Sequence, residues 1–399
     1  MMICSAGNDN ASIMRHLANG EIHLASTKSI KEHSKDFGDK DFMLGVCKHL
    51  VPLPSDTPVR FCSRTNTILY NALLNGQNLI KEILESCENL AIVIGTTTTA
   101  IEENYQRIAK NKYLQDFSAL DNPACFVRNL YGICGLSLGV SSACTSGVKA
   151  IIQGARLIKS NLCEAVICGG VDSLNTLTIN GFDSLDILSP KQSRAYASDR
   201  EGINIGEGAG VFVLVDSKKV EAKPHLARDF RVELKGYASN NDAFHITQPR
   251  DDFAMQERLL QDALKCANLS PKDIDYINLH GTGTKANDEM EANTFAYALQ
   301  GGLKSIPSSS IKPLIGHTLG AAGAIEAGVC AELVLQSLEE NGVKNESTKS
   351  NLVPHIYEFD KNLPKITLAK KGTSTKVRNA LSVSFAFGGD NSAIILGQA

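Results

Sequence analysis

One cysteine of this chain stands in a sequence that suits a nucleophile. Cys144 lies in VSSACTSG, with small residues on both sides, and apolar residues at helical spacing follow from Val148 to Ile158. A thiol at the start of a helix faces unpaired N–H groups and the positive end of the helix dipole, and both favour the thiolate. We therefore expect a lowered thiol pKa, access for a substrate carbonyl, and N–H groups that stabilise an oxyanion. The alternative is a buried structural cysteine, the commoner role among the eleven cysteines.

Two histidines and a lysine occupy comparable positions further along the chain. His280 follows the apolar run YINL and opens HGTGT, and His317 lies in IGHTLGAAGA, where a small-residue helix begins. A histidine held at such a rigid end can donate a hydrogen bond to a carbonyl or exchange a proton near neutral pH. Lys312 precedes His317 in IKPLIGH, and Asp288 and Glu291 lie in HGTGTKANDEME. Taken singly, each of these residues could instead be structural or solvated.

The glycine-rich segment FGGDN (387–391) can present backbone N–H groups to an oxyanion or a phosphate beside Phe387. Alone it is a common turn. The chain has no GxGxxG after a first strand and no GxxxxGK[ST], so nucleotide binding is unsupported. GxSxG occurs as GLSLG (135–139), but this match lies within the apolar run 136–140 and not at a turn into a helix, so standard serine hydrolysis is unsupported as well. It also has no CxxC pair, and we expect no metal site.

These residues need rigid elements to position them. Apolar runs that end in small-residue loops, turns that enter helices and glycine-rich hairpins occur in the first half and again, in the same order, in the second half. They cover 90–99, 136–158, 164–173 and 203–216, then 275–284, 311–338 and 381–396. We interpret the repetition as a duplicated α/β fold with halves 1–230 and 231–399. A single doubly wound sheet is the alternative.

Composition limits the class of protein. The 399 residues include 40 Lys and Arg against 43 Asp and Glu, and 43% are hydrophobic. This balance is typical of a folded globular protein and shows no basic excess, so we expect no nucleic-acid partner. The N-terminus lacks a basic start followed by an apolar run, and the least polar stretch, Leu319 to Leu335, contains Glu326 and Glu332. We expect a cytoplasmic protein with reduced thiols and no membrane span.

Four ordered motifs give the sequence a family resemblance. SSACTSG, HGTGTKANDEMEA, KPLIGHTLGAAGAIEA and FAFGGDN resemble the condensing enzymes of the thiolase-like superfamily, above all the elongating β-ketoacyl-[acyl-carrier-protein] synthases. INIGEGAGVFVLVD resembles a fifth family segment, and the match reaches from about residue 90 to the C-terminus. The resemblance implies a duplicated fold of five layers, α/β/α/β/α, usually in a dimer.

The resemblance also implies a reaction, the decarboxylative Claisen condensation. By motif, Cys144 looks like the nucleophile that accepts an acyl group, and His280 and His317 look like the pair that acts on a malonyl thioester. Phe387 looks like the gate residue, whose N–H joins that of Cys144 in the oxyanion hole. No cofactor of the chain's own is implied, because phosphopantetheine arrives on the partner, an acyl-carrier protein. A homodimer or a heterodimer with a related ketosynthase-like subunit is expected.

Supporting roles are implied for five further residues. Lys312 and Glu291 resemble the family's supporting ion pair, with Asp288 beside it. Thr282 and Thr284 match positions that contact the pantetheine arm.

Several positions depart from the family pattern. Ala386 stands where glycine is common, Asp390 where threonine is common, and Ile203 where a bulky aromatic is common. These changes indicate an unusual acyl chain or a specialised polyketide or polyene pathway. Residues 20–70 match poorly, so Arg60 and Arg64 are only candidates to contact the acidic carrier.

Two alternatives to the elongating enzyme stay open. One is a non-catalytic partner subunit that sets chain length, although such subunits usually lack the nucleophile. The other is a thiolase-like acyltransferase that uses coenzyme A. Degradative thiolases have a second cysteine where His317 stands, which favours decarboxylative elongation.

Overall fold

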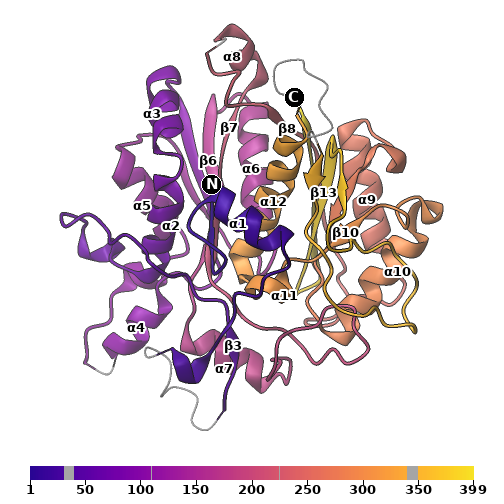
Figure 1. Ribbon diagram of the computed structural model, residues 1–399. Helices are drawn as coiled ribbons and strands as arrows, with labels where there is room; N and C mark the ends of the chain where they lie inside the picture. The colour runs from indigo at the N-terminus through magenta and orange to yellow at the C-terminus, as the bar shows by residue number, and fades with distance from the viewer. Residues whose placement is uncertain (31–39, 109, 224, 339–348) are drawn as a thin grey trace.

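The computed structural model describes residues 1–30, 40–108, 110–223, 225–338 and 349–399. Two five-stranded sheets form its framework (Figure 1). In spatial order, the first contains β1 (Met2–Cys4), β7 (Gly208–Val215), β6 (Ala165–Asp172), β4 (Leu90–Gly95) and β5 (Ser137–Val140). The second contains β8 (Val232–Asn241), β14 (Asp390–Gln398), β13 (Asn379–Ala386), β9 (Tyr276–Asn278) and β10 (Ser308–Ser309).

The two sheets have the same connectivity. Counted in chain order within each sheet, the strands lie in the order 1-5-4-2-3 in both. In each sheet the first strand pairs antiparallel with the fifth and the fifth antiparallel with the fourth, while the remaining pairs are parallel. This confirms the predicted duplicated fold over a single doubly wound sheet. The boundary between residues 230 and 231 stays a prediction.

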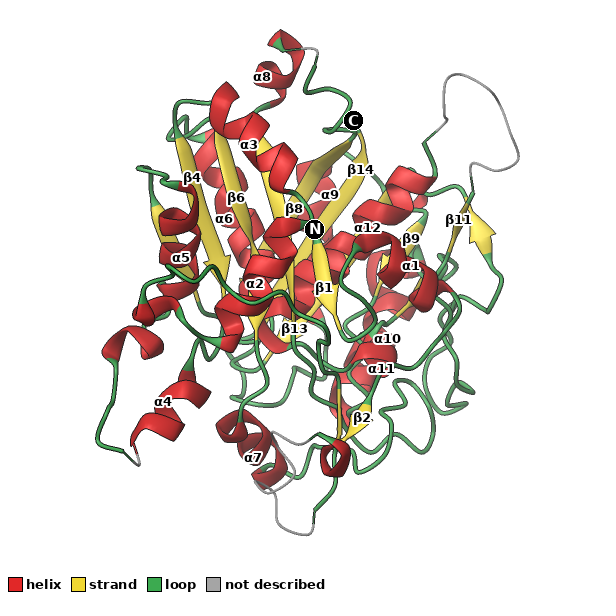
Figure 2. Cartoon of the chain, turned by 60° about the vertical axis from the view of Figure 1, so that its left-hand side comes forward, coloured by secondary structure: helices red, strands yellow, loops and turns green. Residues whose placement is uncertain are grey.

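Helices fill the layers around and between the sheets. The central layer is α6 (Ser146–Lys159) and α12 (Ala322–Gln336), which pack against both sheets and each other. The outer layer of the first sheet includes α2 (Arg64–Leu74) and α5 (Asn122–Tyr131), and that of the second includes α9 (Ala254–Ala267) and α10 (Lys285–Gly301). The remaining α-helices are α1 (Asn10–Ala18), α3 (Gln77–Ser86), α4 (Ile101–Ile108), α7 (Thr176–Ser184), α8 (Ser217–Ala222) and α11 (Lys312–Ile315) (Figure 2). Two small sheets have two strands each: β2 (Ala25–Ser26) pairs with β3 (Met43–Leu44), and β11 (Ser350–Asn351) pairs with β12 (Ser374–Thr375).

Small residues let the central helices approach closely. A Cβ on Gly323 of α12 would lie 2.3 Å from Val148 Cγ2 of α6, and one on Gly147 would lie 2.8 Å from the carbonyl oxygen of Gly320. Both distances are far below ordinary van der Waals contact, so the small-residue pattern of α12 is a packing requirement.

One described segment, Leu319–Gln336, is long and apolar enough to cross a membrane by length and composition. In this fold 78% of it is buried, as in the core helix of a soluble protein. It is therefore weak evidence for a membrane span.

Candidate active site

Cys144 lies in the turn that joins β5 to α6, two residues before the helix begins. Ser146 holds this turn from both sides: its hydroxyl donates to the carbonyl oxygen of Ala143 at 2.6 Å and accepts from the N–H of Ser142 at 2.9 Å. Ala143 has a φ of +51°, in the left-handed region, so the backbone bends sharply just before Cys144. The thiol therefore reaches a cavity while staying 91% buried as a residue, at 9% exposure.

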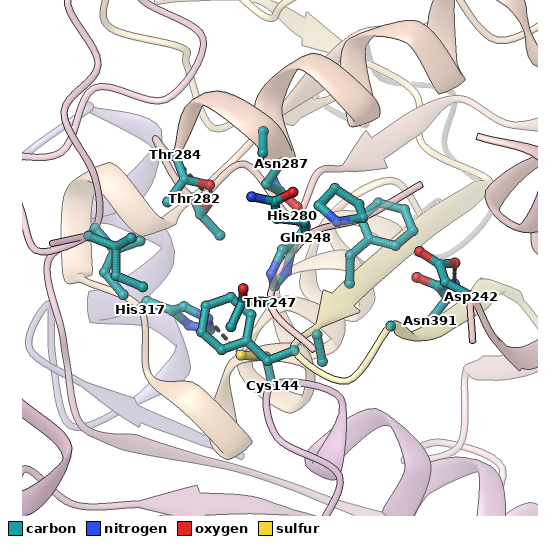
Figure 3. A pocket seen from close by; sticks show the side chains of 18 of the residues that line it. Cys144, Asp242, Thr247, Gln248, His280, Thr282, Thr284, Asn287, His317 and Asn391 are labelled. Carbon is teal, nitrogen blue, oxygen red and sulfur yellow. Dashed lines mark hydrogen bonds between the residues drawn. The ribbon is translucent and has the colours of Figure 1, made fainter. Parts of the chain in front are cut away.

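The cavity brings together residues that are far apart in the sequence (Figure 3). His280 comes from the loop after β9, and His317 from the loop between α11 and α12. His317 Nε2 lies 3.0 Å from Cys144 Sγ, and the two imidazole centroids lie 5.4 Å apart at an interplanar angle of 87°. The structure thus gathers Cys144, His280 and His317 in one place.

Hydrogen bonds on the far side of each ring determine which nitrogen carries the proton. The N–H of Leu319 donates to His317 Nδ1 at 3.2 Å, and the Lys312 ammonium lies 3.2 Å from His280 Nδ1. A backbone N–H and an ammonium can only donate, so the Nδ1 atoms of both histidines are acceptors. Each neutral ring therefore carries its proton on Nε2. Burial, together with the charge of Lys312, holds the pKa of both histidines well below the usual value of 6.5. Both rings are therefore neutral at pH 7 and have a proton to donate from Nε2.

The same three side chains have the atom types of a metal site. Their donor atoms lie within 4.8 Å of one another. A metal requires an unprotonated nitrogen, whereas the donors at both Nδ1 atoms keep the proton on Nε2. The surroundings therefore favour hydrogen bonding to a substrate over metal ligation.

The ion pair of Lys312 differs from the one that the sequence predicted. Lys312 Nζ pairs with the carboxylate of Glu326 in α12 and donates to the carbonyl oxygen of His280 at 2.6 Å. The predicted pairing with Glu291 is wrong, because α10 carries Glu291 to the other side of the HGTGT loop. The sequence did contain a signal for the correct partner: Glu326 is a charged residue within the apolar helix α12. A buried carboxylate needs a cation nearby, so Glu326 was a candidate to pair with Lys312.

Glu291 instead holds the backbone of the histidine loop. Its carboxylate accepts from the N–H groups of His280 at 2.6 Å and Gly281 at 2.7 Å, and from the hydroxyl of Tyr196 at 2.6 Å. Asp288 lies beside it, as expected, and accepts from the N–H of Tyr196 at 2.7 Å. Burial raises the pKa of Glu291 to about 7 and that of Asp288 to about 6. Both carboxyl groups thus position the loop from behind and do not line the cavity.

Lys312→Met should destabilise the fold and disturb the histidines together. It leaves the Glu326 carboxylate buried without a cation, which typically costs about 3–5 kcal/mol of unfolding free energy. Chemical denaturation of the variant measures this cost. Lys312→Met with Glu326→Leu should recover most of the stability, because no charge is left unpaired. A single variant as stable as the wild type would contradict this account of the pair.

The thiol pKa also differs from the sequence-based expectation. Burial raises the pKa of Cys144 to about 12, with Glu326 and Asp172 adding to the rise and the charge of Lys312 opposing it. The predicted lowering by the helix start is therefore wrong for the free protein. Loss of hydration of the thiolate outweighs the favourable helix end. The resting sulfur is a thiol beside His317.

The raised pKa predicts how Cys144 reacts with iodoacetamide. Only the thiolate is alkylated, and below its pKa the thiolate fraction rises about tenfold per pH unit. We expect the rate at Cys144 to rise from pH 7 to about 9 with no plateau, because the pKa lies far above this window. The neutral histidines should add no step near pH 6–7. Peptide mapping by mass spectrometry follows Cys144 separately from exposed Cys62, and a plateau near pH 7 would instead show a preformed thiolate.

Phe387 and the two threonines line the cavity as well. Thr282 Oγ1 and Thr284 Oγ1 lie 3.0 Å apart on one wall. The ring of Phe387 packs 5.9 Å from that of Phe182 of α7, and both rings also border a second, mainly apolar cavity of about 450 Å³ that reaches Cys144. Phe387 therefore stands between two spaces that meet at the sulfur. Among the described residues, no carbonyl or carboxylate accepts a hydrogen bond from the N–H of Cys144 or of Phe387.

The departures from the family pattern lie in different surroundings. Ala386 and Ile203 line the cavity of Cys144. Asp390 lies outside it, paired with Lys149 of α6. Arg64 binds buried Glu207, with Nε 2.7 Å from Oε2, so its charge is occupied inside the fold. Arg60 is exposed against the ring of Phe61 and stays a candidate for carrier contact.

Comparison with known proteins identifies the family. The Beta-ketoacyl synthase N-terminal domain matches residues 68–219, and the Beta-ketoacyl synthase C-terminal domain matches residues 231–341. The chain belongs to the β-ketoacyl synthase family. It is thus a thiolase-like condensing enzyme, an acyltransferase of the 3-oxoacyl-[acyl-carrier-protein] synthase type.

Two curated β-ketoacyl synthases show the breadth of the match. The 3-oxoacyl-[acyl-carrier-protein] synthase 2 of Rhizobium meliloti is 35% identical over 274 residues, which are 66% of this chain and 61% of that protein. The tetracenomycin polyketide synthase ketoacyl synthase alpha subunit of Streptomyces glaucescens is 30% identical over 336 residues, 78% of this chain and 75% of that protein. Fatty acid and polyketide enzymes therefore both resemble this β-ketoacyl synthase.

Solved structures extend the likeness to the full chain. A chain in the complex of the ketosynthase ApeO with its chain length factor ApeC, from Xenorhabdus doucetiae, is 32% identical. The alignment covers 100% of this chain and 96% of that chain, with a TM-score of 0.86. A β-ketoacyl synthase from Burkholderia phymatum, at 22% identity and a TM-score of 0.81, shares the fold.

Proposed function

We propose that this β-ketoacyl synthase condenses an acyl group held on Cys144 with malonyl-[acyl-carrier protein]. The products are β-ketoacyl-[acyl-carrier protein] and CO2, in fatty acid or polyketide and polyene synthesis. One observation carries the proposal: the Cys144 thiol and two neutral imidazoles, each with its proton on Nε2, share a cavity bordered by Phe387.

The first step is acyl transfer to sulfur. The Cys144 sulfur attacks the thioester carbonyl of an acyl-carrier protein, and the thiol proton passes overall to the leaving pantetheine thiol. A tetrahedral oxyanion forms between the N–H groups of Cys144 and Phe387, which have no protein acceptor among the described residues. Each such donor contributes about 3 kcal/mol to the stability of the transition state. The apolar cavity beside Phe182 suits the acyl chain.

The second step makes the carbon nucleophile. The malonyl thioester enters along Thr282 and Thr284, and its carbonyl oxygen accepts from Nε2–H of His280 and of His317. Loss of CO2 leaves the electron pair on the α-carbon as an enolate, whose oxygen those two donors stabilise. Neutral imidazoles serve this role over a wide pH range because their low pKa values prevent titration near neutrality.

The third step joins the two units. The enolate carbon attacks the acyl carbonyl on Cys144, and the tetrahedral intermediate collapses to the β-ketoacyl thioester. The C–S bond to Cys144 breaks, and the sulfur takes up one proton to restore the thiol. Lys312, held by Glu326, keeps the His280 ring in the required tautomer throughout. We assign no cofactor, because the pantetheine arm belongs to the carrier substrate.

The partners follow from the reaction and the relatives. We propose an acyl-carrier protein as the substrate carrier, and a homodimer or a heterodimer with a ketosynthase-like subunit as the assembly. The likeness to a chain of the ApeO–ApeC complex supports the heterodimer. The cytoplasm is the expected compartment, where such carriers supply thioesters.

Mass spectrometry of intact protein tests the function. Mixing with acyl-[acyl-carrier protein] should add one acyl mass to the peptide that bears Cys144, and malonyl-[acyl-carrier protein] should then discharge it as β-ketoacyl-[acyl-carrier protein]. Decarboxylation with no acylation would contradict the proposal and indicate an auxiliary subunit. Acylation without condensation, discharged by coenzyme A, would indicate a thiolase-like transferase.

A further inference from the structure

A charged pair links the nucleophile turn to the gate loop. Asp390 is the first residue of β14 and pairs with Ala386, the last residue of β13, across the turn 387–389 that contains Phe387. Its Oδ2 accepts from Thr145 Oγ1 at 2.8 Å and lies 2.6 Å from Lys149 Nζ. Thr145 directly follows Cys144, and Lys149 lies in the first turn of α6. One carboxylate oxygen therefore bridges the two segments that supply the two oxyanion N–H groups.

The surroundings of Asp390 and Lys149 favour their ion pair. Asp390 is only 7% exposed, and its negative charge lies at the N-terminal turn of α6, where the helix dipole favours it. The side chain of Lys149 is 30% exposed, which keeps its ammonium partly hydrated while its Nζ meets the carboxylate. Such a geometry avoids most of the desolvation cost of a fully buried pair.

Backbone hydrogen bonds also hold the turn 387–389, which carries Phe387. The N–H of Gly389 donates to the carbonyl oxygen of Ala386 at 3.1 Å, and the N–H of Gly388 donates to that of Ile246 at 2.7 Å. Gly388 and Gly389 both have positive φ, at +83° and +71°, which glycine adopts at little cost. Their carbonyl oxygens accept from Asn241 Nδ2 at 2.9 Å and from the N–H of Asp242 at 2.7 Å, which ties the turn to the end of β8. The contacts of Asp390 with Thr145 and Lys149 join this hairpin directly to the turn that carries Cys144.

We infer that the Lys149–Asp390 pair is a positioning device: it sets the separation of the Cys144 and Phe387 N–H groups and thereby the stability of the acyl-transfer oxyanion. The inference rests on the proposed function and adds two residues to those that it assigns. Asp390 stands where the family commonly has threonine, so the device belongs to this chain. Neither side chain touches the substrate, and both act through the backbone.

Lys149→Met tests the inference with two reactions at one sulfur. Acyl transfer from acyl-[acyl-carrier protein] to Cys144 needs both N–H groups, so its single-turnover rate should fall about tenfold when the gate loop shifts. Alkylation of Cys144 by iodoacetamide displaces iodide and forms no oxyanion, so its rate should change by less than about twofold. A merely structural loss would slow both reactions together and would overturn the inference.

A second variant and a control complete the test. Lys149→Met with Asp390→Thr removes both charges, leaves a hydroxyl for Thr145, and should return acyl transfer to within about threefold of wild type. Lys219→Met breaks a comparable pair with Glu164, 2.6 Å apart, which joins α8 to the residue before β6 and lines neither cavity at Cys144, and should change neither reaction. Failure of the double variant to recover overturns the inference.

Hydrogen exchange separates this inference from the proposed function. If the wild type shows no acyl transfer at all, the proposed function fails. The pair is then judged by amide exchange in residues 387–389, which should be faster in Lys149→Met than in the wild type or in Lys219→Met. Unchanged exchange there overturns the positioning role, whatever the reaction.

Discussion

Replacing Cys144 by alanine is expected to lower condensation more than about a thousandfold, because removal of a covalent nucleophile eliminates the acyl intermediate. Decarboxylation of malonyl-[acyl-carrier protein] should persist. The two Nε2–H donors are held by Leu319 and Lys312 and not by the sulfur, so their positions do not depend on Cys144. Product analysis by mass spectrometry should therefore find acetyl-[acyl-carrier protein] and no β-ketoacyl product.

The matched control is Cys330→Ala, which removes another fully buried thiol in α12. It should be acylated and should condense like the wild type, apart from a modest loss of stability. Acylation that survives in Cys144→Ala would mean that one of the other ten thiols carries the acyl group, and the assignment of the nucleophile would be wrong.

Replacing His280 by alanine should have the opposite signature. It removes one of two donors to the enolate oxygen, and the loss of such a donor typically slows a reaction about 10²–10³-fold. Malonyl decarboxylation and condensation should fall by this factor. Acyl transfer to Cys144 should stay within about tenfold of wild type, because its oxyanion uses backbone N–H groups and His317 stays beside the sulfur.

His280→Asn supplies the internal control. An asparagine amide can donate one hydrogen bond from a similar position, so decarboxylation should recover partly compared with His280→Ala. Rates of carbon dioxide release and of Cys144 acylation, measured on the same preparations, decide the point. Equal loss of both reactions in His280→Ala would show a structural role for His280. It would contradict the assignment of His280 to decarboxylation and of the backbone N–H groups to acyl transfer.

The two corrected expectations have one physical origin. A helix start favours a thiolate only to the extent that the sulfur stays solvated, and Cys144 is buried, so its pKa rises to about 12. In the same way, Lys312 takes as its partner the carboxylate that packing brings closest. α12 passes between the two sheets and presents Glu326 to the ammonium, whereas Glu291 is occupied by the backbone of the HGTGT loop. Desolvation and long-range proximity are both properties of the packed chain.

These corrections change how the chemistry is understood. With its pKa raised to about 12, Cys144 is a thiol at neutral pH, so we expect it to react more slowly with alkylating reagents than an exposed thiol does. The Lys312–Glu326 pair contributes by orienting His280 and not by supplying a proton. His280 and His317 are thus both neutral at neutral pH, because burial and the charge of Lys312 lower their pKa values.

The sequence by itself determined the repeated order of strands and helices, the turn that carries Cys144 and the loops that carry His280 and His317. Each of these depends on local features: apolar runs, small-residue turns and helix starts that neighbouring residues dictate. Only the tertiary structure decided which carboxylate neutralises Lys312, which nitrogen of each imidazole carries the proton, how far burial raises the thiol pKa, and that Asp390 joins the gate loop to the nucleophile turn. Those outcomes depend on atoms separated by many residues in the chain, and their energies depend on water that folding removes.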